Sequence, residues 1–173
     1  MEYTFTLKYQ LCASDCDHDR LLERLGAAGC DDALVGVGQV RRIALAFTRE
    51  SASAETAVLS ALADVKRAIP GASLIEATPD FVGLTDVAEL LGVSRQNMRK
   101  LMVNNASFPV PIHDGNVAIW HLADVFAWLA WKGGYQLEQT MVAVARAAKQ
   151  VNLAKGVGQL APEMRREAQA LFT

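Results

Sequence analysis

The 173-residue sequence has few cysteines, no long apolar run and almost no net charge. Its three cysteines, an odd number, argue against a fold held by a disulfide framework. No apolar run approaches the roughly 20 residues that a membrane-spanning helix requires, so we expect no membrane partner. The first ten residues alternate polar and apolar and lack the basic start and apolar centre of a secretory signal. We therefore expect a cytoplasmic protein.

Charged residues nearly cancel overall, with 17 Lys and Arg against 19 Asp and Glu, but they are unevenly distributed. Residues 1–80 carry 8 basic and 12 acidic side chains, whereas residues 81–173 carry 9 basic and 7 acidic. Between Leu90 and His113 there are three basic residues and no acidic ones. A local basic stripe on a nearly neutral protein fits modest affinity for phosphate, with base contacts left to provide specificity.

The first 80 residues predict an α+β domain. Apolar residues alternate with polar ones from Tyr3 to Leu11, which is typical of a half-buried strand. Two amphipathic helices are expected at 17–28 and 53–69, and three more strands at 33–37, 41–48 and 72–77. The resulting order, βαββαβ, is that of a ferredoxin-like domain with both helices on one face of a single sheet. We place its end near residue 80.

Residues 83–104 predict two short helices joined by a tight turn. Thr85 is expected to cap the first helix, Gly92 to end it, and Ser94 to cap the second. On the second helix the apolar side chains share one side and the polar ones share the other, as in a helix-turn-helix that exposes groove-reading residues. The apolar set is Met98, Leu101 and Met102, and the polar set is Arg95, Gln96, Arg99 and Lys100.

A small hairpin is expected next. Asp114-Gly115 separates two apolar runs, 108–112 and 117–120, and this dipeptide favours a type I′ turn because glycine tolerates positive φ. A last apolar helix follows at 121–132. Trp120, Trp128 and Trp131 are expected to pack in a core or interface rather than to stack on bases. A helix-turn-helix followed by a hairpin and a packing helix forms a winged DNA-binding unit over residues 81–134.

The residues of this unit resemble a known family. Leu84-Thr85-Asp86-Val87-Ala88 followed by Gly92-Val93-Ser94, then Phe108-Pro109, Trp120, Val125 and Trp128, resembles the winged helix-turn-helix of the MerR, excisionase and AlpA group. The resemblance implies a bacterial or phage regulator that binds double-stranded DNA. We expect the contacts to come from Thr85, Ser94, Arg95, Gln96, Asn97, Arg99, Lys100, His113 and Asn116.

Residues 135–173 are expected to form helices that dimerise or dock. Leu137, Met141, Val144, Ala148 and Val151 recur at alternating spacings of four and three, and a final helix begins at Pro162. We expect a homodimer on an inverted repeat, with this stripe as its favoured surface. The alternative surface is the open face of the N-terminal sheet, lined by Thr4, Thr6, Lys8, Arg42, Ala44 and Ala46.

No catalytic constellation or cofactor motif is found, so a binding protein is expected rather than an enzyme. Cys12, Cys16, His18 and Cys30 lack the paired spacing of a zinc site, and buried thiols explain them better. The expected function is sequence-specific transcriptional regulation, with a small-molecule or protein effector acting at the N-terminal domain. Three alternatives stay open: an excisionase-like architectural factor, an antitoxin-like protein-interaction module, and a sensor of a metal or small molecule.

Overall fold

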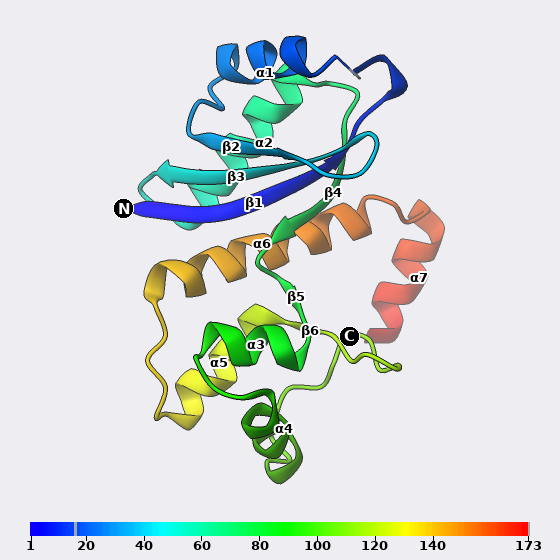
Figure 1. Cartoon of the computed structure of the whole chain (residues 1–173). Helices are drawn as coiled ribbons and strands as arrows, with labels where there is room; N and C mark the ends of the chain where they lie inside the picture. The colour runs from blue at the N-terminus through cyan, green and yellow to red at the C-terminus, as the bar shows by residue number, and fades with distance from the viewer. Residues whose placement is uncertain (16, 173) are drawn as a thin grey trace.

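A computed structural model describes residues 1–15 and 17–172 (Figure 1). The protein is α+β, with a four-stranded antiparallel sheet. Its elements are, in order, β1 (Glu2–Gln10), a 3-10 turn (Ala13–Asp15), α1 (His18–Ala27), β2 (Ala33–Val37), β3 (Arg42–Glu50), α2 (Ala54–Ala68), β4 (Ser73–Thr78), β5 (Phe81–Val82), α3 (Leu84–Leu90), α4 (Arg95–Asn104), β6 (Trp120–His121), α5 (Leu122–Lys132), α6 (Gln139–Val157) and α7 (Pro162–Phe172).

The sheet has the strand order β2-β3-β1-β4. The alternation predicted for β1 is confirmed, because Tyr3, Phe5, Leu7 and Tyr9 are all buried while their neighbours are not. In a strand, side chains point to opposite faces in turn, so these four lie on one face. Their face packs with buried residues of α1 and α2 in a single cluster.

Both helices of this region begin where the sequence predicts. Asp17 caps α1 by accepting from the backbone N–H of Arg20, and Ser53 caps α2 by accepting from that of Thr56. A side-chain oxygen at this position satisfies a backbone donor that the helix itself cannot. The sequence of α1 predicts that Leu21, Leu22 and Leu25 are buried, and this is wrong for Leu22, which is 48% exposed.

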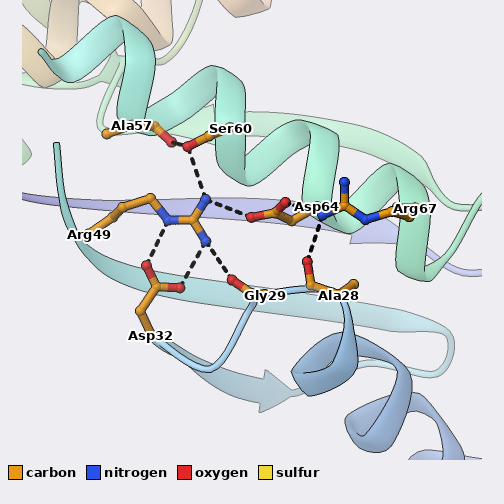
Figure 2. A network of polar contacts seen from close by, with 8 residues as sticks. All are labelled: Ala28, Gly29, Asp32, Arg49, Ala57, Ser60, Asp64 and Arg67. Carbon is orange, nitrogen blue, oxygen red and sulfur yellow. Dashed lines mark hydrogen bonds and ion pairs between the residues drawn. The ribbon is translucent and has the colours of Figure 1, made fainter. Parts of the chain in front are cut away.

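A buried arginine ties β3 to α2 and to the entry of β2 (Figure 2). Arg49 makes two hydrogen bonds to the Asp32 carboxylate, at 2.6 and 2.9 Å, and one to Asp64 at 2.8 Å. It also donates to the Ser60 hydroxyl and the Gly29 carbonyl. The hydrogen bond to Asp32, foremost among these contacts, raises the pKa of Arg49 above its ordinary value. Every donor direction of the guanidinium is used inside the fold, so this cluster is structural.

A second core cluster lies below the sheet in Figure 1 and is built from α3, α4 and α5. The chain enters this cluster through β5, which pairs antiparallel with β6 so that Val82 lies opposite Trp120. Trp120 was expected to pair within a local hairpin instead. The pairing brings the start of α5 beside the segment that leaves the sheet.

Helix α6 runs between the two clusters and contacts β1, β4, α2 and α5 (Figure 1). Val144 and Ala148 are buried in the first cluster, whereas Leu137 and Met141 pack against the second. Lys149 adds an ion pair to Asp124 of α5 at 2.6 Å.

The apolar stripe predicted as a dimer surface instead packs within one chain, with Val144 and Ala148 buried and its other three residues half-buried, so that prediction is wrong. The stripe comprises Leu137, Met141, Val144, Ala148 and Val151, the last of which packs against the first cluster. Sequence periodicity showed that the stripe needed a partner but not that the partner lay in the same chain. The alternative of docking helices is confirmed for α6.

The Asn152 side chain closes this arrangement. Its amide donates to the Ala77 carbonyl and to the Asp80 carboxylate, both at 2.8 Å, and accepts from the Ala77 N–H at 2.9 Å. The other Asp80 oxygen lies 2.7 Å from Nδ1 of His121. Asn152, Asp80 and His121 are 6%, 1% and 6% exposed, so this polar cluster lies out of contact with water.

The last helix, α7, contributes no buried residue, and Leu171 and Phe172 are 83% and 88% exposed. In the part of the chain that the structure describes, no helix combines the length and apolar character needed to cross a membrane.

Replacing Asn152 with leucine should lower the free energy of unfolding by about 2–4 kcal/mol, because the Ala77 amide and the Asp80 carboxylate would stay buried without their partner. Denaturant unfolding measures the loss. The matched control is Gln150→Leu at an exposed position of the same helix, which should change stability by less than about 0.5 kcal/mol. Equal effects of the two substitutions would contradict the role given to Asn152.

Candidate nucleic-acid interface

Helices α3 and α4 contact each other across a tight turn. Gly92 has a φ of +64°, a left-handed conformation that glycine adopts without steric cost, and the Val93 N–H donates to the Ala88 carbonyl at 2.9 Å. The helix start differs from the prediction, because Gly83 occupies the N-cap position and its N–H donates to the Asp86 carboxylate at 2.7 Å. Thr85 is not the cap but an exposed residue within α3.

Helix α4 has the two-sided character predicted for it. The Ser94 hydroxyl caps it by accepting from the Asn97 N–H at 3.1 Å. Met98 is 1% exposed, and Leu101 and Met102 are half-buried against the second cluster. The polar residues predicted for the other side of α4 are all exposed. They are Arg95, Gln96, Arg99 and Lys100, and Asn97 beside them is exposed as well.

The cations of α4 have no carboxylate partner. Among the described residues, none of the salt bridges involves Arg95, Arg99 or Lys100. An exposed guanidinium or ammonium without an internal partner is available to an external anion. The first two turns of the helix thus offer three charged donors and the two amide side chains of Gln96 and Asn97.

Two further residues belong to this surface and were missed from the sequence. Val103 is 67% exposed and follows Arg99 by one helical turn, and Asn104 follows Lys100 in the same way. An apolar side chain at such a place can contact a thymine methyl group, and an asparagine can pair with an adenine edge. The four-residue spacing was the available signal, and the apolar character of Val103 hid it.

The predicted hairpin wing is wrong in its details. The chain makes only an isolated bridge between His113 and Ile119, with residues 114–118 forming a loop between them. Gly115 lacks the positive φ that a type I′ turn requires. His113 and Asn116 lie exposed in or beside this loop.

Aromatic packing explains why the expected strands do not pair regularly. Phe108 makes edge contacts with the rings of Trp120 and Trp128, and Nε1 of Trp120 donates to the Pro109 carbonyl at 2.9 Å. These contacts attach the segment after α4 to Trp120 of β6 and to α5. Trp131 differs from the other two tryptophans: it is 74% exposed, so it does not pack in a core of this chain.

The cysteines do not form a site within the described residues. Cys12 is exposed and donates to the Gly71 carbonyl, contrary to the buried position expected for it, and Cys16 lies outside the described residues. Burial raises the pKa of the Cys30 thiol to about 11, which makes it a poor nucleophile and metal ligand at neutral pH. Across residues 1–15 and 17–172, no group of three or more His, Cys, Asp and Glu side chains could hold a metal.

Comparison with protein-family models, with curated proteins and with solved structures finds no match.

Replacing Met98 with alanine should lower the free energy of unfolding by about 2–5 kcal/mol, since the cavity would lie between α3, α4 and α5. Urea denaturation measures the change. Gln96→Ala, which truncates an exposed side chain on the same helix, is the control and should change stability by less than about 0.5 kcal/mol. A small loss at Met98 would show that α4 is not anchored by this residue.

Proposed function

We propose that the protein is a sequence-specific regulator that binds double-stranded DNA by placing α4 in the major groove. The observation that supports this most is the exposed side of α4, where Arg95, Arg99 and Lys100 have no internal ion pair while Met98 fixes the helix from behind. In a helix-turn-helix, the first helix crosses the backbone and the second presents its first residues to base edges.

The chemistry of the exposed side chains matches the two tasks of such a helix. Arginine pairs bidentately with guanine, and glutamine and asparagine pair in the same way with adenine, so Arg95, Gln96 and Arg99 are proposed to read bases. Lys100 lies farther around the helix and is proposed to contact phosphate. Phosphate contacts give affinity and register, and base contacts give the choice of sequence.

The proposal also assigns roles to the loop at 114–118 and to residues 1–80. The loop at 114–118, with His113 and Asn116, takes the place of a wing and lies against the adjacent backbone. We infer a ferredoxin-like arrangement for residues 1–80, supported by the element order βαββαβ and by the strand order β2-β3-β1-β4. This part would receive a small-molecule or protein effector. The likeness of residues 83–132 to the MerR, excisionase and AlpA group is part of the proposal.

DNA affinity should fall steeply with salt. Each phosphate contact contributes about −0.9 to the slope of log K against log salt concentration. On mixed-sequence DNA the two arginines have no preferred base and are expected to lie against phosphate beside Lys100, so the three cations give a slope of about −2 to −3. Fluorescence anisotropy with mixed-sequence duplex DNA measures it. Lys100→Ala should make the slope shallower by about one. The control Arg146→Ala removes an exposed charge from α6 and should leave the slope unchanged.

A slope near zero for the parent protein would contradict DNA binding and favour the protein-interaction alternative. An excisionase-like factor would show the same slope but would also bend its DNA, which a circular-permutation assay detects.

Base discrimination should depend on the arginines. On a sequence that the parent protein prefers, Arg95→Ala or Arg99→Ala should cost about 1–3 kcal/mol at one base position, whereas Lys100→Ala should weaken all sequences alike. Competition binding with single-base variants of the site separates these effects. If both arginine variants kept the parent's base preferences, α4 would not be the reading helix.

A further inference from the structure

The two edges of the sheet differ in what covers them. At the β4 edge, Asn152 and Lys155 of α6 bond to the backbone of Ala77 and Ile75. At the other edge, β2 is paired with β3 alone in the described part of the chain. Exposed edges are normally guarded by charge, proline or a bulge, because unpaired backbone groups recruit other strands.

The outer edge of β2 presents backbone donors and acceptors. Thr48 donates to the Asp32 carbonyl at 3.1 Å, and backbone directions alternate along a strand. Leu34 and Gly36 therefore turn their backbone groups toward β3, and Val35 and Val37 turn theirs away from the sheet. The Ala33 carbonyl also points away from the sheet, whereas the Ala33 N–H donates to the Cys30 carbonyl.

No guard residue protects this edge. Residues 33–40 contain no charged side chain and no proline. Leu34 is 78% exposed, Val37 51% and Val40 88%. The unpaired backbone groups can pair with a further strand, and the exposed aliphatic side chains favour an apolar one.

We propose that the occupant is β2 of a second copy, paired antiparallel about a two-fold axis through Val35. In this register Val35 exchanges backbone hydrogen bonds with Val35 of the second copy, and Leu34 lies opposite its Gly36. Gly36 borders a cavity of about 480 Å³ on the open face of the sheet, lined also by Ala44 and Ile75. Leu34 of one copy thus lies opposite Gly36 of the other, which has no side chain, and beside the cavity that Gly36 borders.

Charge along the strand also favours self-pairing over another partner. The segment before β2 is acidic, with Asp31 exposed, and the segment after it is basic, with Arg41 and Arg42 exposed. Antiparallel pairing of two identical strands places the acidic end of each beside the basic end of the other. Opposite charges across neighbouring strands stabilise the pair, and like charges destabilise it.

The pairing joins the two sheets into one of eight strands and has a consequence for DNA. Figure 1 shows β2 in the upper half of the molecule and α4 at its lower end, so the two α4 helices of the pair lie far apart. This consequence for DNA rests on the proposed DNA binding, whereas the pairing of β2 does not. If the protein binds DNA through α4, the dimer connects two separate duplexes and does not occupy two adjacent half-sites of one duplex.

Sedimentation without DNA tests the pairing independently of DNA binding. The parent should change from monomer to dimer between micromolar and submillimolar concentration. Leu34→Lys places a charge on the edge and should raise the dissociation constant by roughly tenfold or more. The control Leu59→Lys makes the same change at a 60% exposed position of α2 and should leave it unaltered. A monomeric parent, or a dimer indifferent to Leu34→Lys, would overturn the proposal.

A disulfide tests the register. Cysteines that replace Leu34 and Gly36 in one chain point the same way two residues apart, too far for a bond within the strand, whereas opposite positions across paired strands are within reach. A Cβ at Gly36 would meet only the Ala44 carbonyl oxygen at 3.8 Å, so the substitution fits. Peptide mapping should find residues 34 and 36 linked between chains. Mild oxidation that yields no such link in a dimeric sample would overturn the register.

Discussion

One buried polar cluster holds the molecule in its shape. The Asn152 amide satisfies both backbone groups of Ala77 and one oxygen of Asp80, whose other oxygen contacts His121. These groups come from α6, the sheet, the junction after the sheet and β6. Because polar atoms out of contact with water need partners, no element of the cluster can shift without leaving another unsatisfied. The cluster therefore fixes where the α3–α4 pair lies relative to the sheet.

Local patterns predicted most of the elements. The alternation of β1 between Tyr3 and Tyr9, the serine cap before α4, and the division of α4 about Met98 were all predictable because each depends on neighbours within a few residues. The exposed side chains of the candidate interface were predictable for the same reason. Val103 escaped because an apolar residue on a helix is ordinarily assigned to its buried side.

Long-range pairing was not predictable from these patterns. The stripe on α6 is the same pattern whether its partner is a second copy or, as observed, the cores of its own chain. Trp120 pairs with Val82, far back along the sequence, and its ring packs on Phe108, which overrides the turn preference of Asp114-Gly115. In both cases the side chains that decided the outcome lie in another element.

The burial of that stripe also changes what kind of DNA site is expected. The inverted repeat was expected from a dimer whose favoured surface was the α6 stripe, whereas pairing through β2 separates the two α4 helices, so each α4 must find its own short sequence. Selection of bound duplexes from a random pool by the full-length protein tests this directly. We expect enrichment of one short motif, without a second copy at fixed spacing, and loss of that motif when Arg95 and Arg99 are both replaced by alanine. A pool that shows no enriched motif, or one that is unchanged by these substitutions, would contradict α4 as the DNA-reading element.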